Sequence, residues 1–136
     1  MSDVTSPAMK ALAPVLIVDA VEPCLAFWTD RLGFARDSEV PGADGTLVFA
    51  IVRKAAVEIM YQTRASVVAD NPAQAAELHG HSTGLFITVP TLADLEAAER
   101  AVAGAPIVKP RHKTFYGSEE FYVREPGGNV VGFAAF

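Results

Sequence analysis

The histidines are the residues of this chain best suited to bind a transition metal. His79 and His81 are two positions apart in a polar, glycine-containing stretch, so on an extended segment both would lie on one face and could chelate. A solvated linker is the simpler interpretation of that stretch. His112 lies between Arg111 and Lys113, where like charge opposes the binding of a cation, and this favours a surface loop.

The single cysteine, Cys24, excludes an internal disulfide and a zinc site built from several cysteines. It lies between Pro23 and Leu25 in an apolar helical pattern, which is typical of a small buried side chain rather than a nucleophile. The absence of a disulfide and of a signal-peptide pattern favours a cytoplasmic location. No apolar run reaches the roughly 18–20 residues that a membrane-spanning helix needs, so no membrane partner is expected.

The composition is that of a folded domain. The chain has 136 residues, of which 51% are hydrophobic and 20% are charged. A chain of this length buries roughly two thirds of the surface that it exposes when unfolded, so it needs no disulfide or metal to fold. Lysine and arginine total 11 against 16 aspartates and glutamates, which gives a formal net charge of −5. Nucleic-acid-binding proteins normally carry a basic surplus, so no nucleic-acid partner is expected.

The first half of the chain carries the pattern of one strand, one helix and three further strands. Apolar residues 12–18 predict a strand, and Pro14 marks its edge or its start. Asp19 is predicted to cap a helix that Gly33 ends. The apolar positions of this helix, at helical spacing, are Val21, Leu25, Trp28 and Leu32. Three strands in an antiparallel meander are predicted over residues 34–40, 47–53 and 57–61.

The second half repeats this order of elements. Residues 84–89 predict a strand, and the helix that follows begins after Thr91 and ends at Gly104. Three more strands are predicted over residues 107–109, 119–124 and 129–136.

The repeat predicts an α+β fold of two βαβββ modules. The first module covers about residues 10–62 and the second about residues 83–136. Residues 63–82 are predicted to link them, with one or two helical turns over residues 73–78. The whole chain is therefore expected to form a single domain of two half-length modules.

Two stretches of sequence resemble the opening and closing motifs of a known family. Residues 14–34 read PVLIVDAVEPCLAFWTDRLGF, and residues 121–131 read FYVREPGGNVV, preceded by FYG at residues 115–117. Together they resemble the vicinal oxygen chelate superfamily, which contains glyoxalase I, extradiol dioxygenases and bleomycin-resistance proteins. The resemblance implies a cup-shaped mixed sheet formed by the two modules, with helices outside and the ligand inside the cup.

The resemblance also implies where a metal would be held. Enzymes of the family bind a divalent metal through four side chains, and the matching positions here are Ala13, Glu58, Gly84 and Gly132. Only Glu58 has a side chain that can coordinate a metal. We therefore expect no metal cofactor, and small residues at the other positions predict room for a guest molecule. The alternative is one divalent metal ion held by residues shifted from these positions.

The two-residue period of a strand predicts which side chains line the cup. If Glu58 points into the cup, Met60 and Gln62 share its face. Ile59 and Tyr61 then point toward the helices. The further residues predicted to line the cup are Val15, Ile17, Phe86, Thr88, Val130, Ala134 and Phe136.

This lining is apolar and has one carboxylate, which suits a flat or apolar small molecule with one polar or cationic group. Glu58 would orient such a ligand. Two other roles for Glu58 stay open, an ion pair with a cation such as Arg53 and a protonated buried acid. The residues predicted to bind the ligand are Glu58, Met60, Phe49, Phe86, Phe115 and Tyr116.

Three functions are consistent with the sequence. The first is a metal-independent binding protein that resembles bleomycin-resistance proteins and sequesters an apolar or aromatic ligand, as in antibiotic resistance. The resemblance implies a homodimer in this class, because a second copy of the chain commonly completes the cup. The second is a glyoxalase-like or dioxygenase-like lyase or oxidoreductase that uses a divalent metal, or Glu58 as general base. The third is a module whose cup is filled by its own side chains.

Overall fold

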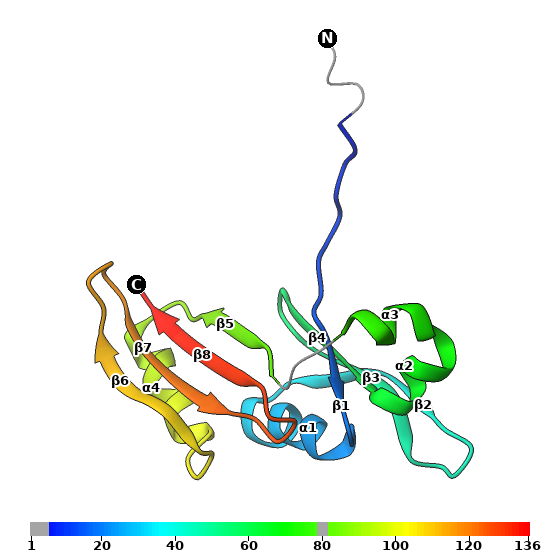
Figure 1. Ribbon diagram of the computed structural model, residues 1–136. Coiled ribbons are helices and arrows are strands. Elements are labelled where there is room, and N and C mark those ends of the chain that lie inside the picture. The colour runs from blue at the N-terminus through cyan, green and yellow to red at the C-terminus, as the bar shows by residue number, and fades with distance from the viewer. Residues whose placement is uncertain (1–5, 79–81) are drawn as a thin grey trace.

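The computed structural model describes residues 6–78 and 82–136 (Figure 1). These residues form eight strands in two four-stranded sheets, together with short helices. Each half has the element order βαβββ, which confirms the predicted α+β fold of two modules. His79 and His81 lie outside the described residues.

The first module runs from β1 to β4. Its elements are β1 (Val15–Val18), α1 (Glu22–Ala26), the π-helical turn η2 (Phe27–Arg31), β2 (Ala35–Pro41), β3 (Leu47–Lys54) and β4 (Val57–Thr63). The strands lie in the order β1-β4-β3-β2, with β1 parallel to β4 and the other pairs antiparallel. The predicted antiparallel meander is thereby confirmed.

The second module has the same topology. Its elements are β5 (Gly84–Thr88), α4 (Leu92–Ala101), β6 (Ile107–Lys113), β7 (Glu119–Arg124) and β8 (Val130–Ala135). The strands lie in the order β5-β8-β7-β6, with β5 parallel to β8. β6 is longer than predicted and continues through the residues that were expected to form a basic loop.

Two short helices, α2 (Arg64–Asp70) and α3 (Pro72–Glu77), lie between the modules. α3 coincides with the helical turns predicted over residues 73–78. α2 was not predicted, because residues 63–82 were interpreted as a polar linker with helical turns only over residues 73–78. The side chain of Thr63 caps α2 by accepting a hydrogen bond of 3.2 Å from the N–H of Ser66.

The first helix starts without the aspartate cap that the sequence predicted. Its N-cap is Val21, which has no side-chain acceptor, and Pro23 follows in the first turn. Because proline has no N–H, one of the donors that a cap would satisfy is missing. Gly33 has a positive φ of 74° and ends the helical segment as predicted.

The first strand is shorter than predicted. It begins at Val15, and the preceding Pro14 contributes only its carbonyl oxygen, which accepts a hydrogen bond from the N–H of Met60. Proline cannot donate to the ladder, so Pro14 stands at the start of the strand, one of its two predicted places. Residues 6–12 are exposed and extend away from the body of the protein (Figure 1).

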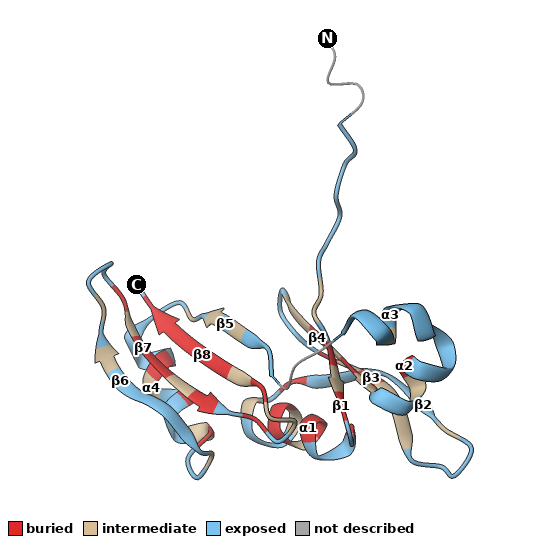
Figure 2. Ribbon diagram, in the orientation of Figure 1, coloured by how far each residue is buried: buried red, intermediate tan, exposed pale blue. Residues whose placement is uncertain are grey.

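Each sheet buries one face in a common hydrophobic core (Figure 2). Alternate strand residues point into this core, among them Leu16, Val52, Ile59, Val123, Val131 and Phe133. Leu25 and Trp28 add two fully buried side chains from the first helical segment. Burial of a large apolar side chain stabilises the fold by about 1.5–3 kcal/mol. Cys24 is buried in the same core, as its apolar surroundings predicted.

A chain of buried hydrogen bonds joins the two modules. The indole N–H of Trp28 donates to Oη of Tyr61 over 2.8 Å, and the Tyr61 hydroxyl donates to Oε2 of Glu125 over 2.5 Å. Oε1 of Glu125 accepts from the backbone N–H of Asn129 over 2.7 Å. Glu125 lies in the turn between β7 and β8, so these bonds connect the first module to the second.

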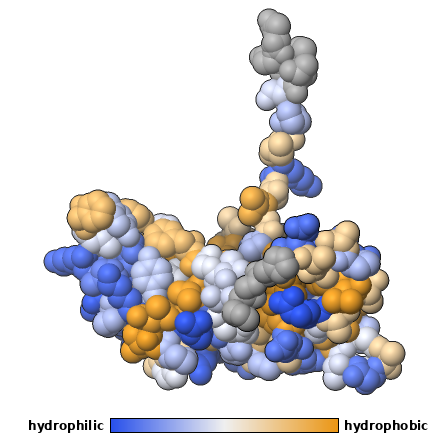
Figure 3. Space-filling view, viewed as in Figure 1, coloured by the Kyte–Doolittle hydropathy of each residue, from blue (hydrophilic) through white to orange (hydrophobic). Residues whose placement is uncertain are grey.

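No helix of the described residues is long and apolar enough to cross a bilayer. Apolar side chains nevertheless lie exposed on both modules (Figure 3). They include Val15, Val40, Phe86, Phe115 and Phe136.

Replacement of Tyr61 by Phe tests the bond chain. Tyr61→Phe removes one hydroxyl and leaves the Trp28 N–H and one Glu125 oxygen buried without a partner, so we expect a loss of about 2–3 kcal/mol in unfolding free energy. Tyr116→Phe is the matched control, because Tyr116 is half exposed and its acceptor Glu120 keeps two other donors. Urea denaturation measures both, and equal losses in the two variants would contradict the role assigned to Tyr61.

Candidate ligand-binding site

The face of the first sheet opposite the core carries the side chains that were predicted to line the cup. Ile59 and Tyr61 of β4 are buried in the core, and Glu58 and Met60 alternate with them on the open face. In the neighbouring strand β3, Phe49 shares the open face.

Glu58 of this face forms an ion pair with Arg53, its direct partner in the β3–β4 register. Arg53 also contacts Oδ2 of Asp37 on β2 at 3.0 Å. Of the three roles left open for Glu58, the structure shows the ion pair. Two carboxylates of the first sheet, those of Glu58 and Asp37, therefore share the guanidinium of Arg53.

The open face of the second sheet carries a second carboxylate, Glu120 of β7. Its side chain is only 1% exposed and accepts three hydrogen bonds from hydroxyl groups. Tyr116 and Ser118 donate to Oε2, each over 2.7 Å, and Tyr122 donates to Oε1 over 2.8 Å. We call this set, Glu120 with its three hydroxyl donors, the Glu120 cluster.

The cluster shifts the pKa values of its members. Burial opposes the ionisation of Glu120, but the hydrogen bonds from Ser118, Tyr116 and Tyr122 outweigh it and lower the pKa of this carboxyl. Burial and the hydrogen bond to Glu120 raise the pKa of Tyr122 to about 12. The same carboxylate raises the pKa of the Tyr116 phenol. Near neutral pH, Glu120 is therefore ionised and both phenols keep their protons.

His112 lies beside this cluster, on β6 opposite Glu120. Its ring stacks on Tyr122, with 6.4 Å between ring centroids. The interpretation of His112 as part of a basic surface loop was wrong, because β6 extends to Lys113. Strand alternation also turns Arg111 away from it, toward Glu96 on α4.

Neither Glu120 nor Tyr122 was predicted as a site residue. The signal was present, because Phe121 and Val123 are apolar and alternate with them along β7. A strand that buries Phe121 and Val123 must turn Glu120 and Tyr122 to its open face. The four positions at which the resemblance places metal ligands, Ala13, Glu58, Gly84 and Gly132, do not include them.

The residues predicted to bind a ligand are divided between the two open faces. Met60 and Phe49 lie on the first sheet with Glu58, and Phe86 and Tyr116 lie in the second module, where each is about half exposed. No strand pair joins the two sheets in the part of the chain that the structure describes. Within one chain the predicted residues therefore form two groups.

Phe115 stands apart from the other predicted residues. Its side chain is fully exposed and contacts the ring of Tyr116 edge-on, with 5.1 Å between ring centroids. Both residues lie in the loop between β6 and β7. The loop thus carries aromatic surface next to the Glu120 cluster.

Gly132 is a position where the resemblance places a metal ligand, and the structure shows what lies against it. A Cβ atom on Gly132 would come within 2.2 Å of Cε2 of Tyr122. The expectation that Gly132 leaves room for a guest was wrong, because the Tyr122 ring fills that space. No atom lies within 4 Å of a Cβ placed on Gly84, so that position is open.

The four family positions do not fit a divalent metal in this chain. Ala13, Gly84 and Gly132 have no donor atoms in their side chains, and the carboxylate of Glu58 is held by Arg53. Across residues 6–78 and 82–136, no group of three or more histidine, cysteine, aspartate or glutamate side chains is placed to hold a metal ion. The open faces therefore offer aromatic and polar contacts in place of metal ligands.

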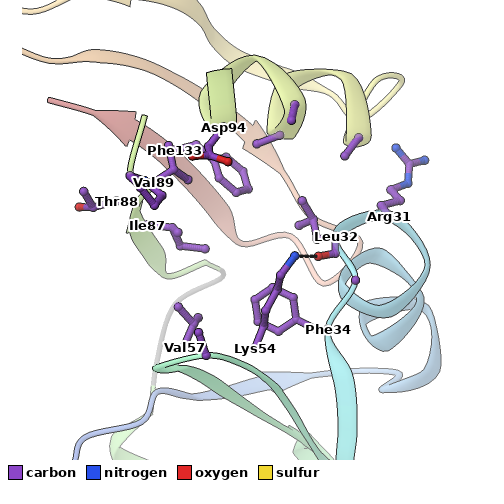
Figure 4. Close-up of a pocket in the computed structure, with 16 residues that line it drawn as sticks. Arg31, Leu32, Phe34, Lys54, Val57, Ile87, Thr88, Val89, Asp94 and Phe133 are labelled. Atoms are coloured by element: carbon purple, nitrogen blue, oxygen red, sulfur yellow. Dashed lines mark hydrogen bonds between the residues drawn. The ribbon is translucent and has the colours of Figure 1, made fainter. Parts of the chain in front are cut away.

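A cavity of about 550 Å³ lies between the modules (Figure 4). Its lining is mostly apolar and includes Phe34, Val57, Ile87, Val89 and Phe133. Nζ of Lys54 lies at its edge and donates to the carbonyl oxygen of Leu32 over 2.7 Å. The sequence did not predict this cavity, because it forms where the β3–β4 hairpin meets β5, a segment distant in sequence.

Residues 10–133 match the family described as the Glyoxalase/Bleomycin resistance protein/Dioxygenase superfamily, and the chain belongs to this family. No curated protein matches the chain. The fold is similar to that of a lactoylglutathione lyase from Agrobacterium tumefaciens, with a TM-score of 0.74, 17% identity and 95% of each chain covered.

Two further solved structures have a similar fold at similarly low sequence identity. TioX from Micromonospora sp. ML1 has a TM-score of 0.73 and 19% identity, over 93% of this chain and 98% of that chain. A glyoxalase/bleomycin resistance protein/dioxygenase from Nocardioides has a TM-score of 0.75 and 16% identity, over 98% of this chain and 87% of that chain. At these identities the similarity extends to the fold alone.

The two glycines at family metal positions give a matched pair of variants. Gly132→Ala would push the Tyr122 ring away from the strand and break its hydrogen bond to Glu120, so we expect a loss of about 1–3 kcal/mol in unfolding free energy. Gly84→Ala meets no atom and should change stability by less than about 0.5 kcal/mol. Thermal and urea denaturation measure both changes. A stable Gly132→Ala protein with an unchanged near-UV spectrum would contradict this packing.

Proposed function

We propose that this protein binds a small apolar or aromatic molecule without a metal ion and sequesters it. The observation that carries this proposal is the open face of the second sheet, where Phe86 and Phe136 are 51% and 69% exposed on the same face as the buried carboxylate of Glu120. Large exposed aromatic side chains around a few placed polar groups are typical of ligand sites. Sequestration of an antibiotic is one role that such a protein would serve.

An enzymatic role for Glu58 has less support. A general base must offer a free oxygen to the proton that it takes up, and the ion pair with Arg53 occupies Oε2 of Glu58 and leaves only Oε1 for this role. Glu120 is likewise engaged by three hydroxyl groups. The partners that Glu58 and Glu120 already have therefore support a role in binding more than a role in proton transfer. The single buried cysteine is consistent with the cytoplasmic location that we also propose.

Metal analysis and ligand screening test this function together. The purified protein should contain less than one equivalent of zinc, nickel, manganese or iron per chain, because three of the four family positions lack donors. A thermal-shift screen of aromatic antibiotics and metabolites should give stabilising ligands whose effect survives EDTA. One tightly bound divalent ion per chain, or ligand binding that EDTA abolishes, would overturn the metal-independent function.

We further propose a homodimer in which a second copy completes each cup. Each chain has two separate open sheet faces, and Val15 and Phe86 expose apolar surface on them. Association of two chains would bury this surface, which is a favourable contribution of about 25 cal/mol per Å² of apolar area. Sedimentation equilibrium should give the mass of two chains at micromolar concentration. The mass of one chain at all concentrations would contradict the dimer.

A further inference from the structure

In the Glu120 cluster, all three hydroxyl groups donate their hydrogen bonds to the carboxylate of Glu120. An ionised carboxylate can only accept, so Tyr116, Ser118 and Tyr122 must each use their single hydroxyl proton on Glu120. The oxygen lone pairs that remain on the two phenols can then only accept a hydrogen bond. Toward the open face, the cluster offers acceptors and no donors of its own.

His112 extends this set of acceptors. Its Nδ1 lies 2.8 Å from the carbonyl oxygen of Pro110, which can only accept, so Nδ1 carries the proton. When the ring is neutral, Nε2 is an acceptor. Because the ring stacks on Tyr122, this nitrogen belongs to the same open face.

Glu120 differs from the other open-face carboxylate in its charge balance. Glu58 is paired with Arg53, whereas within the described residues no lysine or arginine nitrogen lies within 4 Å of Glu120. Arg124, on the same strand as Glu120, is bound to the carbonyl oxygen of Gly128. The negative charge of Glu120 is therefore shared by hydroxyl groups and, within the described residues, has no lysine or arginine partner.

Aromatic rings lie on the same open face as this charge, where Phe86 of β5 is the neighbour of Gly132 on β8 and Gly132 is the neighbour of Tyr122 on β7. Phe86, Tyr116 and Phe136 are each at least half exposed, and the Tyr116 and Phe136 ring centroids are 6.4 Å apart. The faces of such rings attract cations, and the attraction is strongest where water is displaced.

We propose that the Glu120 cluster, together with His112 and the rings of Phe86 and Phe136, binds an organic cation that carries N–H donors, such as a protonated amine or an amidinium on a flat apolar body. The N–H groups would donate to the phenol oxygens and to Nε2 of His112, while the apolar body lies on the aromatic rings. This proposal rests on the proposed binding function and assigns the orienting charge to Glu120 instead of Glu58.

Three benzene derivatives of similar shape test the ligand class. Benzamidinium has the charge and the N–H donors, benzamide has the donors without the charge, and benzoate has the opposite charge. In isothermal titration calorimetry, we expect benzamidinium to bind about tenfold more tightly than either of the others. In amide NMR spectra, its largest shift changes should fall on Phe86, Tyr116, Tyr122 and Phe136.

Variants test the carboxylate. Glu120→Gln should weaken benzamidinium binding by about tenfold or more. Glu119→Gln is the matched control, since Glu119 is the neighbouring acid on the same strand with its side chain near Arg111 on the other face, and it should change affinity by less than about twofold. If Glu120→Gln does not fold, Tyr116→Phe removes one acceptor while keeping the carboxylate, and it should still weaken binding.

The outcomes separate this proposal from the proposed function. Tighter binding of benzoate, equal affinity of all three probes, or a loss caused by Glu58→Gln with no loss from Glu120→Gln and Tyr116→Phe would each overturn the role of the Glu120 cluster. In those cases the protein still binds small molecules, so the proposed function survives. If neither these probes nor any compound of the thermal-shift screen binds, both fail.

Discussion

The buried carboxylate of Glu125 is the constraint on which the arrangement of the two modules depends. A carboxylate that is 2% exposed costs several kcal/mol in lost hydration unless its oxygens receive hydrogen bonds. Tyr61 of the first module supplies one, and Asn129 of its own turn supplies others. Any relative movement of the modules would separate Tyr61 from Glu125 and leave the charge buried without that partner. The modules are therefore held by a polar contact inside an otherwise apolar core.

The turn that carries Glu125 has little space around it. A Cβ on Gly127 would lie 2.7 Å from Val18 and 3.0 Å from Sγ of Cys24, so only glycine allows the backbone of the turn to come this close to the first module. Burial, with the nearby charge of Glu125, raises the pKa of the Cys24 thiol to about 12. Near neutral pH the thiol therefore keeps its proton and packs as a small buried group against the turn that Gly127 allows to come close.

The carboxylates on the two open faces have different partners, although the two modules share one topology. On the first sheet a cross-strand cation, Arg53, forms an ion pair with Glu58. On the second sheet Glu120 is held by hydroxyl groups, and the Tyr122 ring covers Gly132, where metal-using relatives are expected to have a ligand. At a position where the resemblance places a metal ligand, this chain therefore has an aromatic ring beside a hydrogen-bonded carboxylate.

Local patterns in the sequence determined the βαβββ repeat, most strand positions, the helix end at Gly33 and the burial of Cys24, because each depends on spacing or backbone preference within a few residues. They also determined the family, through motifs at both ends of the chain. The tertiary structure decided the rest. The pairing of Glu58 with Arg53, the Tyr122 ring over Gly132 and the bond from Tyr61 to Glu125 all join different strands. Such contacts depend on sheet register and on the packing of distant segments, which local periodicity does not contain.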